Sequence, residues 1–110
     1  MLKGGPPPAD YPGMGRTATP RTVAPQGPLD VDTAELVEAD VHALRRAGAR
    51  EVVVDLHGVT FVDSYGLRVL LALRNAAARD GFRLTLVPGP ASVQRLFDLT
   101  ATRTLFDWAA

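Results

Sequence analysis

Residues 59 to 71, VTFVDSYGLRVLL, pass from β-branched and aromatic residues into a leucine-rich run through a polar break, DSYG, at residues 63–66. The segment before them, EVVVDL at residues 51–56, is a short continuous apolar run, which is typical of a strand buried on both faces of a parallel sheet. The segment after the break has apolar residues at helical spacing and predicts a helix over residues 65–79. This order of strand, polar break and helix indicates the fold class.

The chain after this helix completes a βαβ unit. Gly81 is expected to end the helix, and FRLTLV at residues 82–87 has the alternation of a strand. Strands joined by a helical crossover pair in parallel, so residues 51–56 and 82–87 are predicted to be parallel strands of one sheet. A third helix is expected with Pro90 at its first position, and TLFDW at residues 104–108 suits either a last strand or a helical turn. The predicted class is α/β.

A further helix is predicted upstream, within DVDTAELVEADVHALRRAGA at residues 30–49. Asp32 and Glu35 have the spacing of a capping box, and Gly48 suits a left-handed end. The apolar residues expected on its inward face are Leu36, Val37, Val41 and Leu44.

The N-terminal part of the chain has a different composition. Seven of the nine prolines lie at or before residue 28, and few apolar residues accompany them. Such a segment buries too little apolar surface to offset the entropy of ordering it. Residues 1–24 are therefore predicted to be a disordered extension rich in proline and glycine, and residues 25–110 to be the folded domain.

Composition excludes several classes of protein. The 110 residues suffice for one small core, and the absence of cysteine excludes disulfides and thiolate chemistry. Twelve basic and twelve acidic residues cancel, so no net charge draws the chain to nucleic acid or to an anionic membrane. The expectation is a soluble cytoplasmic protein that neither binds nucleic acid nor inserts into a membrane.

The polar break suits a helix N-terminus, where Asp63 or Ser64 would accept a hydrogen bond from a first-turn amide. Gly66 would allow close approach of a ligand or tight packing on the strand. A serine between strand and helix also resembles the nucleophile elbow G-x-S-x-G, but Val62 replaces its first glycine. His57 could assist only if it approached Ser64, and the two histidines have no metal-ligand spacing. No catalytic residue, metal or cofactor is predicted.

The sequence from residue 52 to residue 108 resembles the STAS domain, the fold of bacterial anti-sigma factor antagonists. The resemblance lies in the Asp-Leu that ends the first strand, in Asp63-Ser64-Tyr65-Gly66-Leu67, which matches an Asp-Ser-x-Gly-Leu signature, and in the Leu-Thr that ends the third helix. Gly27-Pro28-Leu29-Asp30 is similar to the family's Gly-Glu-Leu-Asp. The resemblance implies a mixed sheet of about four strands with three to four helices. The first strands are expected to be missing or shortened to residues 22–24, because prolines flank them.

The resemblance also implies a function. Ser64 would be the residue that a partner anti-sigma factor phosphorylates, and a PP2C-type phosphatase would reverse the modification. The unphosphorylated protein would bind that anti-sigma factor, a serine kinase with a histidine-kinase-like ATPase domain, and so release a sigma factor. The residues expected at the partner-binding surface are Asp30, Asp63, Ser64, Tyr65, Gly66 and Arg68.

Two other functions stay open at this point. One is a STAS interaction subunit of a lipid-transport or signalling complex, which is not phosphorylated and whose binding does not depend on the charge of Ser64. The other is a small hydrolase, which is the weakest because about 80 folded residues leave little room for a serine, a histidine and an acid in one site.

Overall fold

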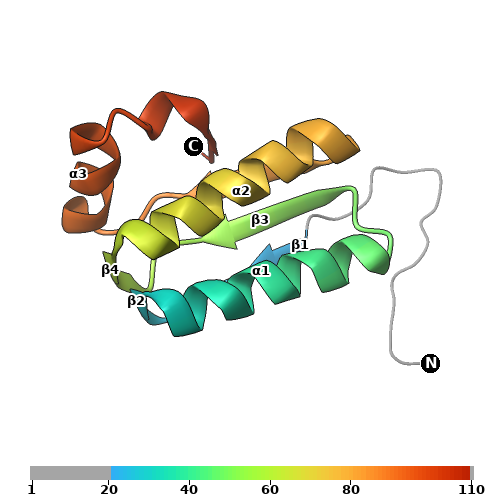
Figure 1. Ribbon diagram of the computed structural model, residues 1–110, viewed down its shortest axis with the longest axis horizontal. Coiled ribbons are helices and arrows are strands. Elements are labelled where there is room, and N and C mark those ends of the chain that lie inside the picture. Colours follow the sequence, from blue (N-terminus) through green and yellow to red (C-terminus); the bar gives the residue numbers. More distant parts are fainter. Residues whose placement is uncertain (1–20, 110) are drawn as a thin grey trace.

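The computed structural model describes residues 21–109 and shows an α/β fold, as predicted (Figure 1). Its helices lie over a sheet of short strands, and each strand of the main sheet pairs with the next in parallel. In chain order the elements are β1 (Arg21–Val23), β2 (Gly27–Leu29), α1 (Val31–Arg46), β3 (Glu51–Asp55), β4 (Val59–Val62), α2 (Ser64–Asp80), β5 (Arg83–Val87), α3 (Ala91–Leu99), the 3-10 helix η1 (Arg103–Leu105) and β6 (Asp107–Trp108).

The strands form two sheets. The main sheet has the order β1-β3-β5-β6, and β2 pairs with β4 in a separate two-stranded sheet. All pairings in the described part of the chain are parallel, so the expectation of a mixed sheet was wrong. A mixed sheet needs an antiparallel neighbour, and residues 21–109 supply none. The helices α1 and α2 lie side by side over one face of the main sheet (Figure 1).

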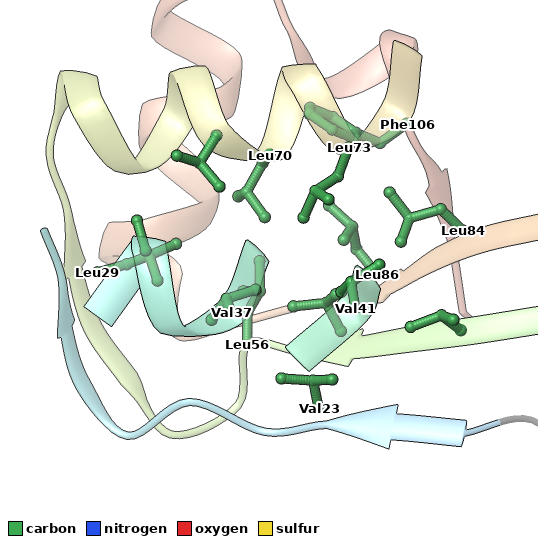
Figure 2. Packing of buried hydrophobic residues seen from close by; sticks show 14 of the residues in the cluster. Val23, Leu29, Val37, Val41, Leu56, Leu70, Leu73, Leu84, Leu86 and Phe106 are labelled. Atoms are coloured by element: carbon green, nitrogen blue, oxygen red, sulfur yellow. The ribbon is translucent and has the colours of Figure 1, made fainter. Parts of the chain in front are cut away.

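The core lies between this face and the two helices (Figure 2). Along β3, Val52 and Val54 are fully buried, whereas Glu51, Val53 and Asp55 are only half-buried. The strand is therefore buried on one face, not on both as its apolar run suggested. A continuous apolar run does not say how much of each face a helix covers, because that depends on the rest of the chain.

The chain reaches the main sheet earlier than the predicted domain boundary. β1 pairs with β3 through Arg21, Thr22 and Val23, one residue earlier than the shortened strand expected at residues 22–24. It lies just before the boundary placed after residue 24, so at least three residues assigned to the extension belong to the sheet. The prediction of disorder for the remainder, residues 1–20, lies outside the described residues.

The start of α1 differs from the sequence prediction. Asp30, not Asp32, is the N-cap, and it forms the capping box with Thr33 rather than with Glu35. Leu36 is 63% exposed, although it was expected in the core. At about 100° per residue, Leu36 lies about 100° around the helix axis from Val37 and outside the face that Ala34, Val37 and Val41 bury.

The ends of the other helices agree better with their sequence signals. Gly81 closes α2 in the left-handed conformation with φ +76°, and Gly48 after α1 also has a positive φ. Pro90 is the N-cap of α3, one position before the one predicted. Residues 104–108, predicted as either a last strand or a helical turn, contain the end of η1 and then β6. Each of the two predictions is therefore correct for part of the segment.

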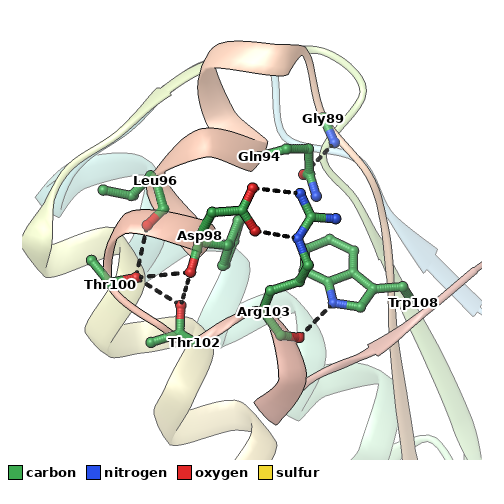
Figure 3. Close-up of polar contacts among 9 residues, drawn as sticks. Gly89, Gln94, Leu96, Asp98, Thr100, Thr102, Arg103 and Trp108 are labelled. Atoms are coloured by element: carbon green, nitrogen blue, oxygen red, sulfur yellow. Dashed lines mark hydrogen bonds and ion pairs between the residues drawn. The ribbon is translucent and has the colours of Figure 1, made fainter.

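Polar contacts fix the C-terminal segment against α3 (Figure 3). The indole Nε1 of Trp108 donates to the carbonyl oxygen of Arg103 at 2.8 Å, and the Arg103 guanidinium pairs with Asp98. The ring of Trp108 also packs edge-on against Phe97, which is fully buried. No helix in the described part of the chain is long and apolar enough to pass through a membrane.

Candidate functional site

The predicted site lies where β2 and β4 end and where α1 and α2 begin. In the two-stranded sheet, Leu29 is the register partner of Val62. Because these strands run in parallel, the residues that follow them, Asp30 and Asp63, stand next to each other at the same end of the sheet. Each is the N-cap of the following helix. Two helix N-termini therefore meet here, an arrangement that favours an anion nearby.

Asp63 holds the first turn of α2. Its Oδ1 accepts a hydrogen bond from the amide of Gly66 at 2.8 Å, and its carbonyl oxygen accepts one from the amide of Leu67. The sequence left Asp63 and Ser64 as alternative caps, and the structure assigns this role to Asp63. The Ser64 hydroxyl is thus not required for capping.

Ser64 is the first residue of α2, and its side chain is exposed. The neighbouring Tyr65 is half-buried. Ser64 therefore lies at the surface of the described part of the chain.

Gly66 explains why the break contains a glycine. It is buried, and a Cβ at this position would lie 2.3 Å from the carbonyl oxygen of Leu29. The same oxygen accepts a hydrogen bond from the amide of Asp63 at 3.3 Å. The first turn of α2 therefore rests directly on the end of β2, and Gly66 serves tight packing, one of the two roles that the sequence allowed.

Asp30 is tied to Thr33 in the same way that Asp63 is tied to Gly66. Its Oδ1 accepts hydrogen bonds from the amides of Asp32 and Thr33, and the Thr33 hydroxyl is 3.1 Å away. These hydrogen bonds, chiefly those from Thr33, lower the pKa of Asp30. Asp30 is half-buried, and its carboxylate already accepts hydrogen bonds from the start of α1. Its main role is therefore to cap the helix, and its charge is less available to a partner.

Tyr65 bridges the two helices beside Ser64. Its hydroxyl donates to Oε2 of Glu35 on α1 at 3.0 Å, and this hydrogen bond raises the pKa of Tyr65. The guanidinium carbon of Arg68 lies 5.6 Å from the centre of the Tyr65 ring, within the range of a cation–π contact. Tyr65 and Arg68 thus form a small cluster next to the serine, with Arg68 exposed.

Sequence reasoning missed three residues near this surface. Glu35 was assigned to a capping box, and its contact with Tyr65, thirty positions away, has no signal in the sequence. Phe61 on β4 is 57% exposed, and Val31 at the start of α1 is 49% exposed. The strand β4 itself was not predicted, because four residues beside a turn give too short a pattern to recognise.

His57, which was considered as a partner of Ser64, lies between β3 and β4. His57 is exposed in the turn after β3, and its backbone amide donates to Oδ1 of Asp55. This hydrogen bond ties the backbone of the turn to the end of β3. Among residues 21–109 no three side chains of the metal-binding kinds stand close enough to hold an ion.

The predicted site residues lie outside one sizeable hollow in the described part of the chain. This hollow of about 540 Å³ lies elsewhere, between β1 and α1, and is lined by residues such as Val23, Leu36 and Asp40. It includes none of the six predicted site residues. Around the predicted site, Ser64, Phe61 and Val31 are exposed, and exposed apolar side chains beside a polar residue suit a macromolecular partner.

Comparison with known proteins agrees with this description. Residues 12–108 match the STAS domain family along almost the whole chain. The protein is a member of the STAS domain family. The resemblance carried by residues 63–67 is thereby confirmed.

Relatives of this STAS domain include bacterial regulators. The anti-sigma-B factor antagonist of Staphylococcus aureus is 29% identical over 79 residues, which cover 72% of this chain and 73% of that protein. The protein of the same name from Staphylococcus epidermidis is 30% identical over 79 residues, with the same coverage.

Solved structures share the fold. The anti-sigma factor antagonist SpoIIAA in its unphosphorylated form superposes with a TM-score of 0.65 at 20% identity, covering 86% of this chain and 85% of that one. The NMR structure of the protein TM1081 gives a TM-score of 0.71 at 18% identity, covering 92% of this chain and 88% of that one. At these identities the likeness establishes the architecture alone.

Proposed function

We propose that this STAS protein is an anti-sigma factor antagonist switched by phosphorylation of Ser64. In its unphosphorylated form it binds an anti-sigma factor with a histidine-kinase-like ATPase domain, and this binding releases a sigma factor. The observation that carries the proposal is the exposed Ser64 hydroxyl, which Asp63 frees from capping. The names of the staphylococcal relatives support the class of partner.

The proposed switch adds charge at the partner-binding surface. The anti-sigma factor transfers the γ-phosphoryl group of its own ATP to Oγ of Ser64; an O–P bond forms, the bond to the β-phosphate breaks, and the hydroxyl proton leaves to a base. The product carries about −1.5 to −2 charge beside Asp63. The start of α2 tolerates this charge, since a helix N-terminus favours an anion by about 0.3–1 kcal/mol. The fold is thus expected to survive phosphorylation.

Binding is expected to respond much more strongly. A phosphate buried against an apolar or acidic partner surface costs several kcal/mol of desolvation, and each 1.4 kcal/mol is a factor of ten in affinity. Phe61 and Val31 would contribute apolar contacts, and Tyr65 and Arg68 polar ones. Asp30 and Gly66 would support this surface by fixing its two helix starts, although Gly66 itself is buried and was expected to contact the partner. A PP2C-type phosphatase in the cytoplasm would remove the phosphate and restore binding.

The chain offers a matched control for the test. It has two serines, Ser64 at the start of α2 and Ser92 at the start of α3, and both are exposed. The protein is incubated with candidate anti-sigma kinases and ATP, and phosphate is located by mass spectrometry. Phosphate is expected in the parent and in Ser92→Ala, but not in Ser64→Ala. Phosphate that persists in Ser64→Ala contradicts the proposal.

Binding is measured with the same partners by calorimetry. Ser64→Asp is expected to weaken binding at least about tenfold relative to Ser92→Asp. Equal affinities of these two variants, together with stable co-purification of a transporter or another large complex, would instead support an interaction subunit that is not phosphorylated.

A further inference from the structure

We propose that Arg68 is the intramolecular ligand of a phosphate on Ser64, and that it leaves the ring of Tyr65 for this phosphate when Ser64 is modified. This inference rests on the proposed phosphorylation of Ser64 and adds a device by which the same chain recognises its own modification. It is carried by the helical spacing of the three residues and by the present position of the Arg68 side chain.

The spacing places Arg68 between the other two residues. At about 3.6 residues per turn, Tyr65 lies about 100° around the axis of α2 from Ser64, and Arg68 lies about 40° from Ser64 on the following turn. Residues four apart on a helix have neighbouring side chains. Ser64 and Arg68 therefore share one face, with the acidic partner nearer the N-terminus, which is the favourable orientation for an i,i+4 ion pair.

The Arg68 side chain is available for this exchange. It is exposed, and its recorded contact is the face of Tyr65 at 5.6 Å. Of the two ion pairs found within residues 21–109, Arg79–Asp80 and Asp98–Arg103, neither involves Arg68. An exposed cation–π contact is worth only about 0.5–1 kcal/mol, whereas an arginine can bind a phosphate through two charge-assisted hydrogen bonds.

The other charges around the cluster are acidic, which makes Arg68 the natural counter-ion. Asp63 precedes the serine, and Glu35 and Glu38 on α1 act on Tyr65 together with Arg68. A dianion placed among three carboxylates is repelled by each of them, and the nearest cation on the same helix face offsets part of this repulsion.

The exchange would change the partner-binding surface in two ways. The phosphate would add negative charge at Ser64, and the departure of Arg68 would uncover the ring of Tyr65. A partner that contacts Arg68 and Tyr65 in their present arrangement would lose both contacts when Ser64 is phosphorylated. The positive charge of Arg68 would also offset part of the negative charge of the phosphate. The electrostatic effect of phosphorylation on partner binding would then be smaller.

The test uses full-length protein with phosphoserine incorporated at position 64 during translation, so that no kinase is needed. The ³¹P resonance is titrated to obtain the second pKa of the phosphate. We expect Arg68→Gln to raise this pKa by about 0.2–0.4 units, the equivalent of one i,i+4 pair. Arg68→Lys is expected to keep most of the effect. Arg79→Gln, at the far end of α2, is expected to leave the pKa unchanged.

A second measurement does not depend on any variant. The Nε–H resonance of Arg68 is compared in ¹H–¹⁵N spectra of the protein with serine and with phosphoserine at position 64, and it is expected to move when phosphate is present. An unchanged Arg68 resonance, or equal phosphate pKa values in the parent and in Arg68→Gln, overturns the inference. Neither result bears on whether a kinase modifies Ser64, so the proposed function stands or falls separately.

Discussion

A Cβ atom on Gly66 would lie 2.3 Å from the carbonyl oxygen of Leu29. This close approach joins the first turn of α2 to the end of β2 and thereby fixes the position of Ser64. The glycine of the Asp-Ser-x-Gly-Leu signature is explained by packing, since a backbone oxygen cannot move aside as a side chain can.

The first prediction concerns this contact. Gly66→Ala is expected to lower the free energy of unfolding by up to about 2 kcal/mol, because overpacking costs about 1–3 kcal/mol and the better helix propensity of alanine returns about 1. Urea denaturation measures the difference. Gly58→Ala is the control: its Cβ would meet the flexible side chain of Gln26, which can move. A loss for Gly58→Ala equal to that for Gly66→Ala would contradict the explanation.

The second prediction concerns the pH dependence of the α1 cap. Hydrogen bonds from Thr33 lower the pKa of Asp30 in the folded protein. The stability that Asp30 contributes is therefore complete above its unfolded pKa of about 3.9 and is lost as the pH falls through the lower, folded value. Asp30→Asn keeps a capping oxygen but does not titrate.

Thermal unfolding at a series of pH values tests this cap. At pH 7, Asp30→Ala is expected to lower Tm by about 5 °C and Asp30→Asn by less. The difference between the parent and Asp30→Asn should shrink below pH 4. A difference that stays constant from pH 7 to pH 2 would show that the carboxylate charge has no part in the cap.

The third prediction concerns Tyr65 and Glu35. The hydrogen bond to Glu35 raises the pKa of Tyr65, so the stability from this contact is present below the unfolded pKa of about 10 and is lost as the pH rises through the folded value. Glu35→Gln is expected to bring the Tyr65 pKa down towards its usual value. Absorbance at alkaline pH measures it in a Tyr11→Phe background, since the chain has two tyrosines.

The control for this titration is Glu51→Gln, because Glu51 lies on β3 and is not among the groups that perturb Tyr65. The Tyr65 pKa should be the same in Glu51→Gln as in the parent. A Tyr65 pKa that Glu35→Gln leaves untouched would mean that the bridge between α1 and α2 does not form in solution.

The fourth prediction concerns the apolar part of the proposed partner surface. Phe61 is 57% exposed on β4, three residues before Ser64. Phe61→Ala is expected to weaken binding of the anti-sigma factor at least about tenfold, since exposed aromatics often dominate interfaces, and to change Tm little. Leu105→Ala, at an exposed leucine in η1 against the C-terminal half of α2, serves as the control. Equal affinities of the two variants for the anti-sigma factor would show that Phe61 does not contribute to the partner-binding surface.

The sequence alone determined the fold class, the βαβ unit and the site's central residues. Strand 51–56, helix 65–79 and strand 82–87 were within one residue of their observed bounds at most ends, because their apolar periodicity and their glycine stop are local properties. Ser64 and Asp63 were recognisable for the same reason, since a helix start depends on neighbouring residues in the chain.

The tertiary structure decided which residues meet. The pairing of β2 with β4 places Asp30 beside Asp63, and the packing of α1 against α2 brings Glu35 to Tyr65. The face that α1 packs against the core, with Ala34, Val37 and Val41, also leaves Leu36 exposed despite its apolar character. These contacts join residues about thirty positions apart, and no local pattern encodes them, because the free energy that selects them comes from burying the core as a whole.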